Sequence, residues 1–575
     1  MYSDGIQRNS HHSIEFDHRR TSFAGWHEAS ENMDEGAASV ALSYANNFEG
    51  CGASGFNICA DLILTHGSLL NVKVTSTPEI DDFIENMTAG EVRSVPMSLR
   101  ENLKVRVYRQ REAASKIDKE NRKMSTRFCE KSVENSSLEI VEAEGSVIAA
   151  WKCPLLDNTF REVLSGWSFD KTRKNERSLL PIFVIVQLDR KNRPNISLEK
   201  EASRARRALN RFVERIDHPL MNPPRGASLE ILSTPFGNPV FINSASRGVV
   251  SNVFGDDGCI MLTDANAVPG SEGAPIYVIQ TENKKSCICG MVIAPLSWCR
   301  GEWVDYTFAA NLLPCLRSLL RSRCLDRYVD EPKSRIADLV DQSLVLVRCG
   351  GSWGTGIIFD AGTGTIITCS HVVRKAPESR IKVVLRRGDD SVASGSSPTS
   401  SSSSSSSSWA KLLYRTAEEE PYDVAVLKLD PRDIEPMLRS IKIATRQSAF
   451  RGELVASAGF PFFSSRFPTI TRGNVSAISD CMLRTTCCVQ SGSSGGPIVR
   501  WSNGEMLGMV VCNAIAKNET KLYPRLNMAV PVSILEPPIS EYLRTGEVKA
   551  LDALGNQDLG VKRTWNFYRL PSSKI

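Results

Sequence analysis

The chain has 575 residues, 41% of them hydrophobic, with 70 basic and 65 acidic side chains and a formal net charge of +5. This length exceeds what one hydrophobic core serves, so two large domains or three to four smaller ones are predicted. The balanced charge argues against a nucleic-acid partner, and no run approaches the roughly 20 apolar residues that a membrane-spanning helix needs.

The N-terminal stretch MYSDGIQRNSHHSIEFDHRR is polar and charged, unlike a secretory signal peptide. Sixteen cysteines follow along the chain, and the close pairs Cys287/Cys289 and Cys487/Cys488 lack the C-x-x-C spacing of zinc and redox sites. Buried, reduced thiols in an intracellular protein are therefore expected, with no metal and no cofactor.

Pieces of the first half of the chain return in the second half in the same order. PGSEGAPIYV (269–278) parallels SGSSGGPIVR (491–500), and ICGMVIA (288–294) parallels MLGMVVC (506–512). Such internal repeats predict two copies of one fold. The predicted division is an N-terminal tail at 1–30, a first copy at 31–322, a linker at 323–334, a second copy at 335–540 and a C-terminal tail at 541–575.

Two segments of the first copy, KVRVYRQREAASKIDKENRK (104–123) and SLEKEASRARRALNRFVERI (197–216), are basic and are predicted to be helical insertions. One interpretation is a docking surface for an acidic partner or a substrate. The alternative, a solvated helical face, is the more common use of such charge runs and is favoured here.

From about Ser334 the chain consists of short β-branched runs separated by glycines, such as GTIITCSHVV, YDVAVLKLD and EMLGMVVC. Runs of this length at this spacing predict an all-β barrel or sandwich. The serine tract at 394–408 lies between two of these runs and is predicted to be a disordered surface insertion.

Three polar residues stand beside these runs in the order His371, Asp423, Ser494, which is the order of the chymotrypsin-type triad. A serine hydroxyl needs a base, and an imidazole oriented by a carboxylate provides one. His371 is the only one of the seven histidines in this half of the chain. Singly, each residue is more simply a structural histidine, a turn former or a loop serine; together, in this order, they favour catalysis.

The stretch QSGSSGGPIV (490–499) is predicted to be a nucleophile turn rather than a flexible linker. In the pattern G-x-S-G-G-P, glycines let the backbone turn so that two N–H groups point into one hole. The N–H groups of Gly492 and Ser494 are predicted to stabilise the oxyanion of a tetrahedral intermediate. Ser494 is then the nucleophile and Ser493 only its neighbour.

Residues 335–535 resemble the trypsin-like serine protease domain of the HtrA and Deg family, in the motifs TGIIFD, IITCSHVV, YDVAVLKL, SGSSGGP and LNMAVP. The resemblance implies an endopeptidase with the chymotrypsin fold, so that the chain would hold two tandem double β-barrels. It implies that Cys488 lies at the base of the substrate pocket, where an uncharged residue favours a small or medium apolar P1 side chain. The strand that starts at Gly508 would pair with extended substrate and line the pocket.

Alignment of the first copy with this domain places Glu272 at the serine position, Ser68 at the histidine position and Ile182 at the aspartate position. His66 then lies two residues before the histidine position and is not predicted to act as a base. Since all three positions differ, the first copy is predicted to be an inactive pseudoprotease domain.

The last residues, Ser573, Lys574 and Ile575, resemble the S-K-L import address of peroxisomes. With the tandem trypsin-like copies, they make the chain similar to the peroxisomal leader-processing protease family, which is related to the plant Deg15 enzymes. This resemblance implies a peroxisome-matrix endopeptidase that removes targeting leaders from imported fatty-acid β-oxidation enzymes, cuts others next to cysteine, and cleaves itself.

The partners implied are protein substrates and the import receptor. Two alternatives stay open: an HtrA-like quality-control protease outside peroxisomes, and a catalytically silent binding scaffold. The sequence also leaves open the oligomeric state, with a homo-oligomer among the options.

Overall fold

The computed structural model describes residues 39–44, 52–70, 78–112, 138–163, 176–189, 197–216, 222–279, 287–299, 302–320, 334–376, 380–385, 407–434, 436, 438–444, 449–461, 467–515 and 522–566. The predicted import tripeptide 573–575 and the serine tract up to residue 406 lie outside them. The last two residues of the predicted disordered insertion, Ser407 and Ser408, are instead strand residues, because they pair with Val384 and Val383.

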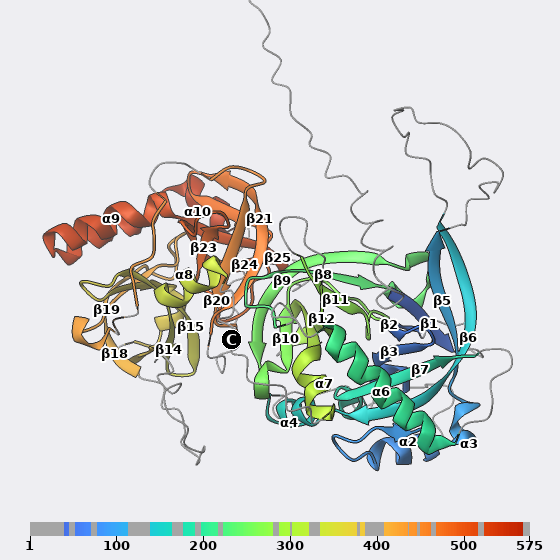
Figure 1. The fold of residues 1–575 in the computed structure, drawn as a ribbon. Coiled ribbons are helices and arrows are strands. Elements are labelled where there is room, and N and C mark those ends of the chain that lie inside the picture. Colours follow the sequence, from blue (N-terminus) through green and yellow to red (C-terminus); the bar gives the residue numbers. More distant parts are fainter. Residues whose placement is uncertain are drawn as a thin grey trace, which may run out of the picture.

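Figure 1 shows two bodies, one built by the first half of the chain (blue to green) and the other by the second half (yellow to red). In the first half, a seven-stranded sheet has the order β4-β6-β5-β1-β2-β3-β7, and an additional β6–β7 pairing closes the strands from β6 to β7 into a ring, with β4 outside it. Its strands are β1 (Ser39–Tyr44), β2 (Gly52–Cys59), β3 (Leu62–His66), β4 (Arg93–Ser94), β5 (Lys104–Glu112), β6 (Leu138–Lys152) and β7 (Ile182–Leu188).

A closed barrel of order β10-β13-β12-β11-β8-β9 completes this half. Its strands are β8 (Ser228–Ser233), β9 (Ser244–Phe254), β10 (Ile260–Thr263), β11 (Pro275–Val278), β12 (Cys287–Cys299) and β13 (Glu302–Asn311). The helices of this half are α2 (Pro78–Glu85), α3 (Met97–Arg100), α4 (Pro154–Val163), α5 (Glu176–Leu179), α6 (Leu198–Ile216) and α7 (Leu312–Leu320).

The second half contains two closed barrels, of orders β14-β15-β16-β19-β18-β17 and β20-β21-β22-β25-β24-β23. The first comprises β14 (Leu344–Cys349), β15 (Ser352–Asp360), β16 (Thr365–Thr368), β17 (Ile381–Val384), β18 (Ser407–Arg415) and β19 (Ala425–Lys428). The second comprises β20 (Leu454–Gly459), β21 (Thr469–Ser479), β22 (Met482–Thr485), β23 (Pro497–Arg500), β24 (Met506–Ile515) and β25 (Leu522–Pro531). Helices α8 (Arg335–Ser343), α9 (Val532–Thr545) and α10 (Leu559–Asn566) flank them.

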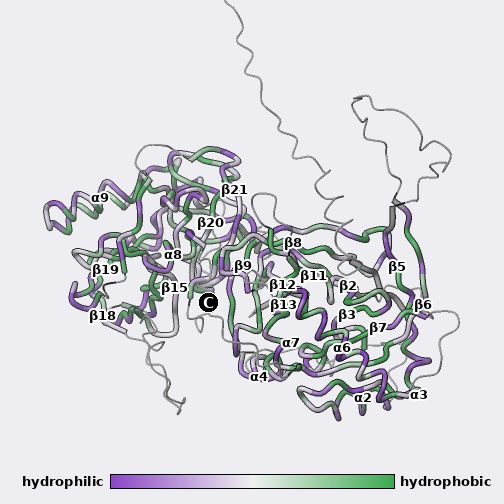
Figure 2. Tube along the Cα trace, in the orientation of Figure 1, coloured by the Kyte–Doolittle hydropathy of each residue, from purple (hydrophilic) through white to green (hydrophobic). Residues whose placement is uncertain are grey.

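The strands of the two halves follow the same ring order. The ring that starts at β1 has the order β1-β2-β3-β7-β6-β5, and the ring that starts at β14 has the order β14-β15-β16-β19-β18-β17. In both rings the third strand pairs with the last strand. The barrels β8–β13 and β20–β25 have this same order. The predicted fold class, all-β dominated with tandem double barrels, is therefore confirmed. Hydrophobic stretches follow the strands and helices inside both halves (Figure 2), as expected where β-branched residues pack inside a barrel.

The helix predicted at 104–123 is wrong for its first nine residues, which form β5. The reason is the alternation in KVRVYRQRE: Val105 and Val107 are buried, whereas Lys104 is exposed and Arg106 is half-buried. A period of two is that of a strand. Residues 113–123 of the prediction lie outside the described residues.

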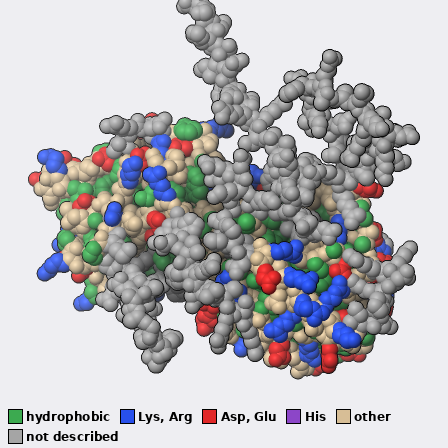
Figure 3. All heavy atoms as spheres, viewed as in Figure 1, with side chains coloured by type: hydrophobic (Ala, Val, Ile, Leu, Met, Phe, Trp, Pro, Cys, Tyr) green, Lys and Arg blue, Asp and Glu red, His purple; other side chains and the backbone are tan. Residues whose placement is uncertain are grey.

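The helix predicted at 197–216 is present as α6. Its buried residues Ala205, Leu209 and Phe212 recur at helical spacing and pack into the core of the first half. The opposite face carries exposed arginines that contribute to the basic patch visible over this half in Figure 3. The docking function suggested for this face stays a prediction. None of the described helices is both long and apolar enough to cross a membrane.

Candidate active site

The second half places His371 and Asp423 side by side. His371 lies in the 3₁₀ helix η6 (Ser370–Val373), directly after β16, and Asp423 precedes β19. Since β16 pairs with β19, with Thr368 opposite Ala425, the two residues emerge at the same end of the barrel. His371 Nδ1 lies 2.6 Å from Asp423 Oδ2, and the His371 backbone N–H donates to Asp423 Oδ1 at 2.9 Å.

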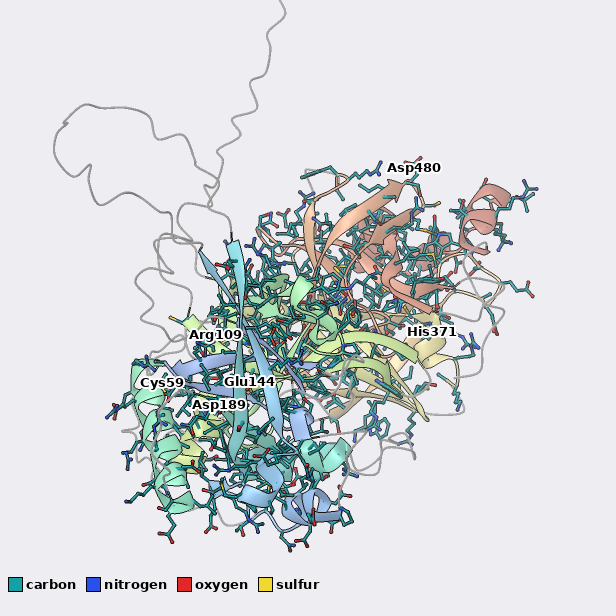
Figure 4. All side chains as sticks on the ribbon, turned by 90° about the vertical axis from the view of Figure 1, so that its right-hand side faces the viewer. Cys59, Arg109, Glu144, Asp189, His371 and Asp480 are labelled. Atoms are coloured by element: carbon teal, nitrogen blue, oxygen red, sulfur yellow. The ribbon has the colours of Figure 1, made fainter. Side chains whose placement is uncertain are left out.

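A carboxylate that accepts Nδ1–H holds the imidazole in the tautomer whose Nε2 is a base. The side chain of His371 is about one third exposed (37%), so its ring can be reached from solvent. Figure 4 places His371 on the second half, apart from the labelled residues Cys59 and Glu144 of the first half.

The predicted nucleophile turn has the conformation needed for an oxyanion hole. Ser493 N donates to Gln490 O at 2.9 Å, and Gly492, the third residue of this turn, has φ of +93°. Positive φ at the third position defines a type II turn and favours glycine. Among the described residues, the N–H groups of Gly492 and Ser494 donate to no protein acceptor, so both are available to a ligand.

The Ser494 hydroxyl donates to Val511 O at 3.1 Å. Within the part of the chain that the structure describes, no hydrogen bond joins it to His371. The two segments are nevertheless in contact, because a Cβ on Gly495 would lie 2.6 Å from Thr368 Oγ1 and 3.1 Å from Cys369 N. Rotation about the Cα–Cβ bond of Ser494 redirects the hydroxyl, and catalytic hydrogen bonds commonly tighten only when substrate binds.

Gly492→Ala should lower peptide hydrolysis by about 10²–10³-fold, the effect of losing one oxyanion donor. An added Cβ would collide with Phe460 O and Trp353 Nε1, and φ of +93° is unfavourable for alanine. The turn would therefore move and take the Gly492 N–H with it. Steady-state kinetics on a fluorogenic peptide measures the loss. Gly452→Ala, at an exposed glycine with φ of +87° where an added Cβ would meet no atom within 4 Å, is the control for backbone strain alone.

The two residues predicted for the substrate pocket lie in different surroundings. Cys488 is 2% exposed, and its thiol donates to Asp305 O of the first half at 3.4 Å. Burial raises the pKa of this thiol to about 12, so it remains a donor. Gly508 is paired on both sides, with Ile498 and Pro531, and the structure does not bring it to the nucleophile turn. The part of β24 that reaches Ser494 is Val511, three residues further on.

Sequence reasoning missed the side chains that hold the turn. Thr355 Oγ1 donates to Gly492 O at 2.8 Å and accepts from Phe460 N at 3.1 Å. In the first half, Ser54 Oγ donates to Gly270 O at 2.8 Å in the same way. The parallel between GASGFNIC (52–59) and WGTGIIFD (353–360) could have indicated both hydroxyls.

No sequence pattern indicates the two buried amide oxygens Gln490 Oε1 and Asn513 Oδ1. Neither has a hydrogen-bond partner among the described residues. Both side chains are more than nine-tenths buried, and Asn513 Nδ2 donates to Val489 O at 2.7 Å. They therefore lie beside the segment that leads into the nucleophile turn and could each accept one hydrogen bond.

The first half has the same framework without the triad side chains. Thr65 pairs with Val184 as Thr368 pairs with Ala425. Asp423 lies two residues before Ala425, and Ile182 lies two residues before Val184, so Ile182 occupies the position of Asp423. Ser68 lies in η1 (Gly67–Leu70), the counterpart of η6, at the position of His371.

Glu272, at the serine position, occupies the hole itself. Its Oε2 accepts from Gly270 N at 2.7 Å, and Gly270 has φ of +92°, like Gly492. A protein carboxylate thus takes the N–H that an oxyanion would need.

His66 is a structural residue. Its Nε2 contacts Leu180 O at 3.1 Å, and its Nδ1 accepts from Ser68 N at 3.1 Å. Burial lowers its pKa to about 4, so the ring is neutral near pH 7. Both ring nitrogens are occupied by backbone groups, which leaves none to act as a base.

One group of possible metal ligands occurs among the described residues: the ligand atoms of Cys369, His371 and Asp423 lie within 4.8 Å of one another. His371 and Asp423 already bond to each other, and the Cys369 thiol donates to Val510 O at 3.2 Å. The group therefore fits the triad without a metal.

Comparisons with known proteins agree with this geometry. Residues 354–509 match the family model described as trypsin-like peptidase domain. The chain is 31% identical over 391 residues to the peroxisomal leader peptide-processing protease of Homo sapiens, covering 62% of this chain and 63% of that protein. The Mus musculus protein of the same name gives 31% over 388 residues, with the same shares. The periplasmic serine endoprotease DegP of Escherichia coli is 25% identical over 211 residues, or 34% of this chain and 37% of that protein.

The chain thus spans a little under two thirds of the length of its mammalian relatives. The resemblance indicated by the motifs around His371 and Ser494 is confirmed. Residues 354–509 are a trypsin-like peptidase domain of the serine protease class, in a chain similar to the peroxisomal leader peptide-processing proteases.

Proposed function

We propose that the second half of the chain is a serine endopeptidase whose triad is His371, Asp423 and Ser494. The observation that carries this proposal is the 2.6 Å contact between His371 Nδ1 and Asp423 Oδ2, beside a turn in which the Gly492 and Ser494 N–H groups have no acceptor among the described residues. A carboxylate, an oriented imidazole and a preformed anion site are the parts that acyl transfer from peptides requires.

The reaction begins when the Ser494 hydroxyl turns from Val511 O to His371 Nε2. Nε2 takes the hydroxyl proton as Oγ forms a bond to the peptide carbonyl carbon, and the carbonyl electrons move onto oxygen. The N–H groups of Gly492 and Ser494 bind that oxyanion. The imidazolium then protonates the leaving amine, the C–N bond breaks, and water hydrolyses the acyl-enzyme by the same proton path in reverse.

The P1 side chain enters between two segments, 488–490 and 511–513, because its carbonyl must lie against both Ser494 and the hole. No carboxylate lines these segments, which disfavours a basic P1 residue. The amide oxygens of Gln490 and Asn513 favour a small side chain that donates one hydrogen bond. A cysteine thiol meets both requirements.

The first half, within the predicted boundaries 31–322, is a pseudoprotease domain joined by the linker 323–334 to the active domain 335–540. Glu272, Ser68 and Ile182 support this role, since none can replace the triad residue at its position. The N-terminal tail is 1–30, whereas the predicted C-terminal tail, 541–575, starts inside α9 and includes α10, whose Trp565 is buried in the core of the second half.

The chain acts in the peroxisome matrix. The mammalian relatives are named for processing leader peptides of peroxisomal proteins. Imported fatty-acid β-oxidation enzymes are the proposed substrates, and the chain itself is a further one. The import receptor would bind Ser573, Lys574 and Ile575.

The test of the proposed chemistry is reaction of the purified full-length protein with a fluorophosphonate, followed by peptide mapping. An adduct at Ser494 alone is expected. Incubation with a leader-bearing β-oxidation enzyme should then release a new N-terminus, identified by mass spectrometry. An unlabelled protein that still binds this enzyme would support the silent scaffold instead.

Deletion of residues 573–575 should abolish import into peroxisomes, because a receptor reads this tripeptide as an address. Fluorescence microscopy of the tagged full-length chain in cells measures the outcome, with the tag at the N-terminus. Ile575→Leu, which restores the S-K-L form, is the control and should keep import. A truncated chain that still reaches peroxisomes would contradict the assignment, and an active chain that never enters them would be a quality-control protease.

A further inference from the structure

The two halves meet through corresponding strands: β9 lies against β21, and β13 against β25. Hydrogen bonds cross this interface at several points. Asn252 Nδ2 donates to Phe467 O at 3.2 Å and to Thr469 Oγ1 at 3.1 Å. Asp264, which is buried, accepts from Arg472 N at 2.6 Å. The second barrel of the second half, which carries the nucleophile turn, is thus the barrel that the first half contacts.

The residue nearest the proposed P1 pocket in this interface is Cys488. It packs among buried hydrophobic residues of the first half rather than of its own half. Its thiol donates to Asp305 O at 3.4 Å, and the Tyr306 hydroxyl donates to its carbonyl at 3.5 Å. Thr471 Oγ1 of its own barrel donates to the same carbonyl at 2.9 Å. Two consecutive residues of β13 therefore hold both the side chain and the backbone of Cys488.

Strand β13 also contacts the segment 524–525 of the second half. The Arg525 guanidinium forms an ion pair with the Asp305 carboxylate and donates to Asp264 O at 2.7 Å. Its neighbour Pro524 accepts from Val489 N at 3.1 Å. The segments 488–489 and 524–525 are thus bonded to each other and to the same strand of the first half.

The hydrogen bonds described for the triad do not involve the first half. His371 and Asp423 belong to the other barrel of the second half, and their hydrogen bonds described above stay within that half. Ser494 bonds to Val511, which is also in the second half. Loss of contact at β13 should therefore affect the P1 pocket more than the reacting groups.

We propose that the first half completes the P1 pocket of the second half, with Asp305 and Tyr306 as positioning residues for its wall at 488–490, directly and through the segment 524–525 that is bonded to this wall. This inference rests on the proposed peptidase function. The pseudoprotease domain is then a built-in part of the specificity site, although it has no catalytic residue of its own. The ligand class concerned is the P1 side chain of a peptide substrate.

The experiment compares full-length wild type with Tyr306→Phe and Asp305→Asn. Each is assayed on fluorogenic peptide amides that are identical except for Cys, Ala, Leu or Lys at P1. Tyr306→Phe keeps the ring and removes only the hydroxyl, so it should fold normally; thermal unfolding checks this. We expect kcat/KM for the preferred peptide to fall about tenfold, mainly through KM, and discrimination among P1 residues to fall by a similar factor. The rate of fluorophosphonate labelling at Ser494 should change less than about threefold, because the reagent carries no P1 side chain.

Arg225→Gln is the matched control. Arg225 pairs with Asp341 and donates to Pro468 O at 2.8 Å across the same interface, away from the segments 488–490 and 524–525. It should keep the wild-type P1 discrimination. An equal loss of P1 discrimination in Arg225→Gln would show that any weakened contact between the halves has this effect, and would overturn the proposal. Unchanged P1 discrimination in both Tyr306→Phe and Asp305→Asn would also overturn it. A wild type without labelling or hydrolysis would instead refute the peptidase function itself.

Discussion

Ser494→Ala lowers peptide hydrolysis by about 10⁶-fold, the scale found when a triad serine is removed. The variant keeps the turn and its N–H groups but has no oxygen to form the acyl-enzyme. Single-turnover assays with a fluorogenic peptide measure the residual rate, and fluorophosphonate labelling should vanish. Among the described residues, Ser494 Oγ makes one part-buried hydrogen bond, to Val511 O, so the free energy of unfolding should change by no more than about 1 kcal/mol.

The control for this prediction is the neighbouring serine. The Ser493 hydroxyl accepts from Gln490 N at 3.4 Å and lies on the buried side of the turn. Ser493→Ala should therefore keep hydrolysis within about tenfold of wild type, since one weak hydrogen bond is lost. Full activity in Ser494→Ala would refute the triad assignment, whatever the result for Ser493.

Asp423→Asn should lower kcat by about 10⁴-fold at neutral pH, as expected when the imidazole takes the wrong tautomer. Asp423 Oδ1 accepts from the His371 backbone N–H, so an asparagine keeps its oxygen there and turns its amide NH₂ toward Nδ1. Nδ1 must then accept, the ring proton moves to Nε2, and Nε2 cannot take the Ser494 proton. Kinetics measured from pH 6 to 10 tests this outcome.

The matched control is Asp430→Asn. Asp430 is an exposed carboxylate near β19 that accepts from Arg432 N at 3.0 Å, and it has no place in the proposed reaction. Its activity should match wild type. If Asp423→Asn retained wild-type kcat, the carboxylate would have only a structural role and another group would have to orient His371.

The parts of the candidate active site that could be predicted from sequence are those with a local signature. Gly492 and Ser494 belong to one six-residue motif, and the turn type follows from that motif. His371 could be assigned because no other histidine occurs in its half. The degenerate positions Ser68 and Ile182 followed from repeats, and the pairing of β3 with β7 places both as predicted.

The remainder depends on contacts between residues far apart in the chain. The environment of Cys488 is set by Asp305, 183 positions earlier, and no local pattern reveals that contact. The bond from Gly270 N to Glu272 depends on a side-chain conformation that composition does not indicate. The charged side chains of 104–112 favour a helical insertion when the sequence is considered alone, whereas the alternation of its valines is the pattern that the strand follows.

The contacts of β9 with β21 and of β13 with β25 bear on the origin of the chain. Contacts between equivalent strands of two copies are what an isologous dimer with two-fold symmetry presents. Fusion of two such subunits into one chain would preserve the interface and leave one redundant reaction centre. On the proposed function, that centre would have lost its nucleophile to Glu272 while its barrel continued to support the other copy. Such a duplication would separate two duties that each subunit of a symmetric dimer has to combine.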